Sequence, residues 1–292
     1  MVADSAVKYA SDQPSLASSP DYAQSYKAPV MVGLLAAGLC LLAVWLIRRL
    51  ARPGKLSLAN TPDRHNTLNP GHIVLVIALL LAGSGGLKAL LDNTQLDAQK
   101  VDILVALGGQ LTWLVGGLLV GALCFRHGLS RGMGLSLRRW FTDTTRGLWA
   151  FLAIMPIWVG LYWLTLWLAE SFKIPIRAHQ ILKLVQQSPG GWRVLTVVTA
   201  VVVAPLAEEI FARGLMQSMI RRYTQRPWLA IVVTSVVFAL LHMEFWYSMP
   251  ALAALAVAIG YNYERTGRLL APIIIHALFN CVNIWLYVAY AD

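Results

Sequence analysis

Two adjacent carboxylates in a strongly apolar stretch are the side chains of this sequence best suited to chemistry. Glu208 and Glu209 follow Pro205, and Arg213 comes four residues after Glu209. Neighbouring residues on a helix point about 100 degrees apart, so the two carboxylates must serve different purposes. Residues four apart share a face, and a Glu that precedes a basic residue forms the better oriented pair. We therefore expect Glu209 to pair with Arg213 and Glu208 to face another helix.

Two imidazoles and a carboxamide follow on later apolar stretches. His242 ends one stretch, and His276 lies four residues before Asn280 on the last one, so this second pair shares a helix face. A single histidine is more typical of a hydrogen-bonded core residue than of a catalyst. Together with Glu208, however, these side chains supply a general base, a partner for it and oxyanion donors. This combination is suited to hydrolysis inside a protected cavity.

The elements that must position these residues are apolar stretches of membrane-spanning character. Of the 292 residues, 58% are hydrophobic and 13% are charged, against about 25% charged in a typical soluble domain. The stretches run over about Ala28 to Ile47, His72 to Leu91, Val101 to Phe125, Leu148 to Ala169, Val194 to Ile220, Trp228 to Leu241, Pro250 to Tyr261 and Leu269 to Tyr290. The sixth and seventh are shorter than the roughly 20 residues that a bilayer requires. The sequence predicts an all-α, polytopic membrane helix bundle with about eight transmembrane helices.

The chain divides into three parts on this pattern. We expect a disordered N-terminal tail over residues 1–27, membrane helices with interfacial segments over 28–193, and a catalytic core over 194–292. Among the connecting segments, Ser130 to Gly147 is expected to form an interfacial amphipathic helix. The segment Phe172 to Trp192 is likewise expected to lie on the membrane, and a substrate gate is the alternative for both segments.

Aromatic side chains are frequent in the fourth stretch. In transmembrane helices Trp and Tyr gather at the membrane interface. We expect lipid-facing or interfacial packing for Trp149, Trp158, Tyr162, Trp163 and Trp167.

Basic residues fall in the loops of one side. The net charge is +10, and sixteen of the 24 Lys and Arg residues lie in loops that eight spans place together. These sixteen are Arg48, Arg49, Arg52, Lys55, Arg64, Arg126, Arg131, Arg138, Arg139, Arg146, Arg213, Arg221, Arg222, Arg226, Arg265 and Arg268. The positive-inside rule makes that side cytoplasmic and both termini extracytoplasmic. The same rule and the anionic lipid bilayer account for the charge, so no nucleic-acid partner is expected.

Three motifs in order resemble one family. Glu-Glu-x-x-x-Arg at Glu208, Phe-x-x-x-His at Phe238 and His-x-x-x-Asn at His276 resemble the type II CAAX prenyl endopeptidase and bacteriocin-processing family, also called the CPBP or Abi family. The resemblance covers about Val194 to Tyr290. It implies an intramembrane peptidase of about eight helices in the plasma membrane, with a conical cavity open toward the membrane and the cytoplasm.

Residue roles follow from the same resemblance. Glu208 would be the general base that activates water, and His242 would position or polarise that water. His276 and Asn280 would stabilise the tetrahedral oxyanion. Glu209 and Arg213 would hold the helix in place. The substrate would be a membrane-embedded or membrane-bound peptide or protein, of a lipidated or CAAX-like kind in some relatives, and no oligomeric state is predicted.

Other chemistries and functions stay open at this point. Glu208, His242 and His276 are also a possible zinc set, although the HExxH spacing is absent and a metal-free glutamate mechanism without a cofactor is favoured. A scaffold or a bacteriocin self-immunity protein would need no catalyst. A proton-coupled transporter would use the same three residues as a relay.

Overall fold

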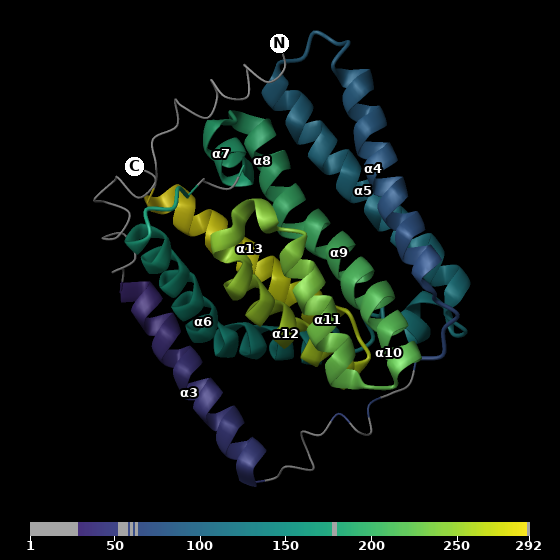
Figure 1. Ribbon diagram of the computed structural model, residues 1–292, viewed down its shortest axis with the longest axis vertical. Coiled ribbons are helices and arrows are strands. Elements are labelled where there is room, and N and C mark those ends of the chain that lie inside the picture. The colour runs from purple at the N-terminus through teal and green to yellow at the C-terminus, as the bar shows by residue number, and fades with distance from the viewer. Residues whose placement is uncertain (1–28, 52–57, 59–60, 62–63, 177–179, 291–292) are drawn as a thin grey trace.

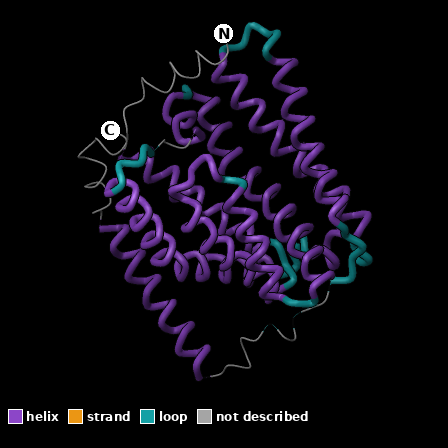
Figure 2. Tube along the Cα trace, in the orientation of Figure 1, coloured by secondary structure: helices purple, strands orange, loops and turns teal. Residues whose placement is uncertain are grey.

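The described residues form a bundle of helices. The computed structural model describes residues 29–51, 58, 61, 64–176 and 180–290, and these contain helices and loops but no strand (Figure 2). The tail predicted over residues 1–27 lies outside the described residues. The all-helical class predicted from the sequence is confirmed for the described chain.

Every predicted apolar stretch coincides with a helix. The elements are α3 (Pro29–Ala51), α4 (Pro70–Leu91), α5 (Ala98–Cys124), η3 (Gly128–Met133), α6 (Trp140–Ser171), α7 (Gln180–Gln187), α8 (Gly190–Val198), η4 (Thr199–Val203), α9 (Ala204–Glu209), η5 (Ile210–Gln217), α10 (Ser218–Thr224), α11 (Pro227–Leu240), η6 (Met243–Ser248), α12 (Met249–Thr266) and α13 (Leu270–Tyr290). Within the described residues, six helical segments are long and apolar enough to cross a membrane, and two apolar helices are shorter. The chain is a multi-pass membrane protein.

The seventh stretch is longer in the structure than the sequence suggests. η6 and α12 together make a 24-residue segment, Met243–Thr266, because polar residues such as Asn262 and Glu264 continue the helix beyond the apolar run. α11 remains short, with 14 residues. At 1.5 Å per residue such a helix covers about 21 Å, less than a hydrocarbon core of about 30 Å. His242 follows its C-terminal end directly, so this imidazole lies at membrane depth.

The separate interfacial helix predicted for Ser130 to Gly147 is not formed. A loop follows η3, and α6 begins at Trp140 as one continuous 32-residue helix. The physical reason is Asp143, which is fully buried and accepts two hydrogen bonds of 2.6 Å from Arg268. This pair anchors the start of α6 to the α12–α13 turn, and it raises the pKa of the Arg268 guanidinium above its ordinary value. The apolar side chains of the segment, Leu137, Trp140 and Phe141, do remain exposed.

The helices are arranged around a central group made of α11, α12, α13 and the continuous segment α8 to α10. α3 packs on α6 at one flank, and α4 packs on α5 at the opposite flank (Figure 1). α6 contacts α12 and α13, and α5 contacts α9 and η5. Large apolar side chains such as Leu81, Leu123 and Val194 are exposed on the outside of the bundle, as a lipid solvent requires.

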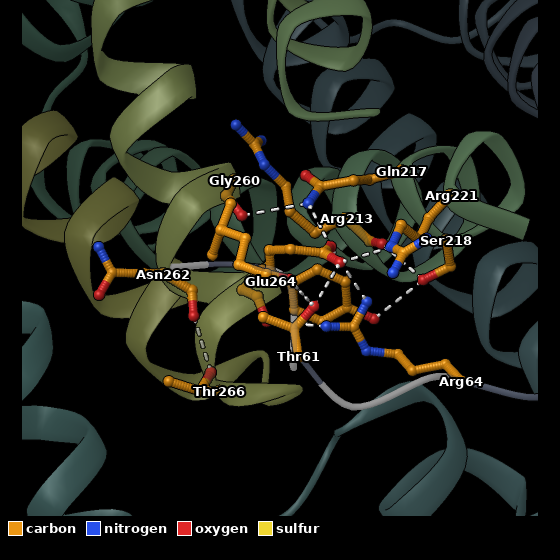
Figure 3. Close-up of polar contacts among 12 residues, drawn as sticks. Thr61, Arg64, Arg213, Gln217, Ser218, Arg221, Gly260, Asn262, Glu264 and Thr266 are labelled. Atoms are coloured by element: carbon orange, nitrogen blue, oxygen red, sulfur yellow. Dashed lines mark hydrogen bonds and ion pairs between the residues drawn. The ribbon is translucent and has the colours of Figure 1, made fainter. Parts of the chain in front are cut away.

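A buried acidic residue joins the α3–α4 connection to the centre. Glu264 on α12 is fully buried, and its carboxylate accepts hydrogen bonds from Arg221 at 3.0 Å, Gln217 at 3.2 Å and Thr61 at 3.4 Å (Figure 3). Arg64 lies 3.7 Å from the same carboxylate and stacks over the ring of the neighbouring Tyr263. A buried charge is tolerated only when it is paired in this way. The network therefore fixes Thr61 and Arg64 against α10 and α12.

The basic loops meet at this same end of the bundle. Arg222 donates to the Leu68 carbonyl at 2.6 Å, and Leu269 N–H donates to the Gly134 carbonyl at 3.0 Å. Gly134 has a φ of +88°, and a Cβ there would lie 2.0 Å from the Gly267 carbonyl oxygen, so only glycine fits this crossing. The described part of the α3–α4 connection and the loops that follow α5, α10 and α12 are thus gathered at one end.

Candidate active site

The helix that carries the two carboxylates is irregular on both sides of them. α9 contains Pro205, Glu208 and Glu209, and it is flanked by the π-helical segments η4 and η5. Proline removes a backbone hydrogen-bond donor, and each π turn widens the helix. Both changes alter the directions of the nearby side chains and backbone carbonyls. π-helical turns occur frequently at functional sites. The helix winding therefore changes on both sides of the two carboxylates.

Glu209 is the buried anchor of the site. Its Oε1 accepts hydrogen bonds from Arg213 Nη1 at 2.9 Å and from His276 Nδ1 at 2.8 Å, and all three side chains are nearly or fully inaccessible. Arg213 also donates to the Ala256 carbonyl at 3.0 Å, and its guanidinium lies 5.0 Å from the centre of the Phe238 ring. The ion pair predicted from the four-residue spacing is present. Together with the contacts to Phe238, Ala256 and His276, this ion pair connects η5 to α11, α12 and α13.

His276 connects the two carboxylates. Its Nδ1 faces Glu209, and its Nε2 lies 3.7 Å from Oε2 of Glu208. A carboxylate only accepts hydrogen bonds, so Nδ1 carries a proton. Nε2 is then a donor only when the ring holds both protons, and an acceptor when it is neutral. The Glu208 side chain is 12% exposed, so this carboxylate reaches the cavity while Glu209 does not.

His242 is held by its own helix. Its Nδ1 lies 2.9 Å from the Phe238 carbonyl, which accepts only, so Nδ1 donates and Nε2 of the neutral ring is an acceptor. The Phe238 ring packs against both imidazoles, with centroids 4.9 Å from His242 and 5.6 Å from His276. The phenylalanine of the second motif thus spaces the two histidines.

Asn280 lies one turn beyond His276 on α13. Its Nδ2 donates to the Ala200 carbonyl of η4 at 2.7 Å. The π-helical winding frees carbonyls of this kind from regular helix hydrogen bonds. One N–H of the carboxamide therefore holds the Asn280 side chain in place, and the second N–H can donate to another acceptor.

These side chains line one cavity of about 270 Å³. Its polar groups include Glu208, His242, His276 and Asn280. The rest of the wall is mostly aromatic and aliphatic, with Trp158, Tyr162, Phe238, Phe245, Tyr247, Leu252, Phe279, Ile181, Leu182 and Ile284 among its members. The four candidate positions, from α9, the end of α11 and α13, are thus brought to one place.

Two aromatic residues of the fourth stretch face this cavity instead of lipid. Trp158 is 5% exposed, and its ring contacts Tyr162 at 5.8 Å and Phe279 at 5.1 Å between centroids. Trp149 and Trp167 are exposed at the outside, as expected. The expectation was wrong for Trp158 and Tyr162 because α6 buries one face against α12 and α13, a choice that composition does not reveal.

Sequence reasoning also missed Gln110 of α5, which lies outside all three motifs. Its Nε2 donates to Oε1 of Glu208 at 3.2 Å, and the residue lines the cavity. The available signal was a carboxamide in the middle of an apolar span, since polar residues at membrane depth are rare and tend to be functional.

The three donors of the zinc alternative, Glu208, His242 and His276, all line the cavity. Among the residues that the structure describes, no three His, Cys, Asp or Glu side chains are grouped as a metal site requires. Nδ1 of His276 is engaged with Glu209 and Nδ1 of His242 with a carbonyl, which is also how zinc-bound histidines are oriented, and Nε2 of both rings is left open. Chelation therefore has to distinguish the metal-free glutamate mechanism from a zinc mechanism.

The cavity lies toward the end of the bundle opposite the basic loops. Gln110 is in the first half of α5, His242 and η6 follow the C-terminal end of α11, and Ile181 and Leu182 come from α7. The basic loops lie at the other ends of α5 and α11. The positive-inside rule predicted a cytoplasmic basic end, and the family resemblance implied a cavity open to the membrane and the cytoplasm; the cavity residues lie nearer the end away from the basic loops.

The fold and the site define a multi-pass membrane protein whose helices enclose a polar cavity in the bundle. Residues 190–282 match the family described as Type II CAAX prenyl endopeptidase Rce1-like, which is the family that the three motifs resemble. The chain is similar to an uncharacterized 24.3 kDa protein of Escherichia coli, with 31% identity over 86 residues, which is 28% of this chain and 40% of that relative. The match thus spans well under half of the relative. No solved structure matches the chain.

Proposed function

We propose that the protein is an intramembrane endopeptidase that hydrolyses peptide bonds of membrane-associated substrates by means of a glutamate-activated water. The observation that carries the proposal is the meeting of Glu208, His242, His276 and Asn280 at one cavity, with Glu208 accessible and Glu209 sealed behind it. A scaffold has no need for an accessible carboxylate at membrane depth beside two imidazoles.

The chemistry follows from the donors and acceptors at the site. Glu208 takes a proton from water, and Nε2 of neutral His242 accepts the other hydrogen of that water, so the oxygen is directed at the scissile carbonyl. The hydroxide adds to the carbonyl carbon and the C=O electrons move to oxygen. The second N–H of Asn280, together with Nε2–H of His276 when both ring nitrogens are protonated, stabilises this oxyanion. Glu208 then returns its proton to the leaving amine as the C–N bond breaks.

The size of the cavity bears on the form of the substrate. A cavity of about 270 Å³ receives only a short segment of the substrate beside Glu208. The aromatic wall suits apolar side chains or a lipid-modified residue, as in the CAAX-like substrates that the family resemblance implies.

The decisive experiment compares membrane peptides from cells that carry the parent protein, Glu208→Ala or His242→Ala. We expect peptides present with the parent to be missing with both variants, because each variant removes one group that holds the water. Immunoblots must show equal insertion of all three proteins. Three coinciding profiles would refute the peptidase and leave a scaffold or immunity role. Phenanthroline added to the active purified protein is expected to leave the rate unchanged, and a loss restored by zinc would reinstate the metal mechanism.

We further propose that the protein resides in the plasma membrane with its basic end in the cytoplasm, which places the cavity end on the extracytoplasmic side. In a background with Cys40, Cys124 and Cys281 changed to Ser, Glu244→Cys beside the cavity should react with an impermeant maleimide on intact cells. Arg226→Cys, in the α10–α11 turn, should react only after permeabilisation. The reversed pattern would place the cavity at the cytoplasm.

A further inference from the structure

A carboxamide from outside the segment that matches the family lies beside the candidate general base. Gln110 is on α5, and the family match begins at residue 190. α5 is fixed against the catalytic helix close to this position: Trp113 packs on Phe211 with centroids 4.8 Å apart, and a Cβ on Gly117 would lie 2.9 Å from the Ile210 side chain. Gln110 is therefore presented to Glu208 by a firmly packed element.

The orientation of this carboxamide is set by the acceptor that it faces. A carboxylate only accepts, so the NH₂ group of Gln110 is the end that points to Oε1 of Glu208. The other end, Oε1 of Gln110, is buried and has no hydrogen-bond partner among the residues that the structure describes. An unsatisfied buried acceptor costs about 1–3 kcal/mol. Stability alone would therefore favour an aliphatic side chain here, and such costs are typical of functional sites.

We infer that Gln110 is a positioning residue for Glu208, an inference that rests on the proposed peptidase function. The Gln110 hydrogen bond holds Oε1 of Glu208, and Oε2 is then the oxygen directed toward His276 and the water. Without this bond the carboxylate rotates about its last side-chain torsion, which has a broad, two-fold profile. The other ionisable groups described near Glu208 are Glu209, Arg213, His276 and, in the same cavity, His242; Glu209 and Arg213 are already paired with each other.

The test is Gln110→Leu, with Gln99→Leu as the matched control. Gln99 is on the same helix and its Nε2 donates to the Ser188 hydroxyl at 3.0 Å, so the control removes an equivalent hydrogen bond away from Glu208. We expect Gln110→Leu to lower kcat by about 10- to 100-fold with KM within about twofold, since a misplacement of about 1 Å costs a factor of this size. Its unfolding midpoint in detergent should not fall, because the unsatisfied acceptor is removed. Gln110→Glu, which places a second carboxylate beside Glu208, should be at least as impaired.

A second readout does not depend on activity. Dicyclohexylcarbodiimide modifies protonated carboxyl groups, and a carboxylate that has lost a hydrogen-bond donor is protonated more readily. Labelling of Glu208, measured by mass spectrometry, is expected to rise severalfold in Gln110→Leu and to stay at the parent level in Gln99→Leu. A parent-like kcat, or a lower kcat accompanied by a lower unfolding midpoint and unchanged labelling, would overturn the inference. If no variant, including the parent, shows Glu208-dependent hydrolysis, the proposed function fails and the labelling alone decides the role of Gln110.

Discussion

Replacing Glu208 with Gln is expected to lower kcat for peptide hydrolysis by about 10²- to 10⁴-fold, the usual contribution of a general base. Gln has the same shape as Glu but cannot take a proton from water. The Glu208 side chain is 12% exposed and accepts its hydrogen bond from the neutral Gln110, so the neutral amide should be tolerated in the fold. The measurement is the initial rate of cleavage of a membrane peptide that the parent protein processes, with the purified variant in the same detergent.

The control for this variant is Glu170→Gln. Glu170 lies in the last turn of α6 and is exposed, so the same change of charge there should leave the parent rate in place. The unfolding midpoints of both variants should match that of the parent. A Glu208→Gln protein that keeps the parent kcat would show that another group is the base, and a variant that fails to fold would be replaced by Glu208→Ala.

Replacing Arg213 with Met is expected to destabilise the fold by about 3–5 kcal/mol, the cost of removing one partner of a buried ion pair. Glu209 is fully inaccessible, and it would keep only the His276 hydrogen bond, since its Oε2 already has no partner in the described part of the chain. The hydrogen bond to the Ala256 carbonyl and the contact with the Phe238 ring would be lost as well. A decrease on the order of 10 °C in the unfolding midpoint should follow.

The double variant Glu209→Leu with Arg213→Met separates stability from activity. Removing both charges together leaves no unpaired ion, and apolar side chains of similar volume often replace a buried pair without loss. We expect most of the lost unfolding midpoint to return. Activity should not return, because Nδ1 of His276 has then lost the acceptor that orients its ring. A single Arg213→Met variant as stable as the parent would contradict this account of the pair.

The sequence by itself determined the helices and the choice of catalytic candidates. Apolar runs at membrane length leave the backbone no alternative to helix, because lipid offers no hydrogen-bond partner. An ionisable residue in such a run must have a partner or a task, which singled out Glu208, Glu209 and Arg213 before any contact was known. The four-residue spacings placed Glu209 with Arg213 and His276 with Asn280 because helix geometry is local.

The tertiary structure alone decided which face of each helix meets the cavity. Gln110 and Glu208 are 98 positions apart and come together through the packing of α5 on α9. Trp158 faces inward because α6 packs against α12 and α13. Asp143 pairs with Arg268, so the later part of the predicted interfacial helix belongs to the first turns of α6. A period of 3.6 residues shows that a helix has faces, but in a membrane nearly every face is apolar, so only contacts between helices select the face that lines the site.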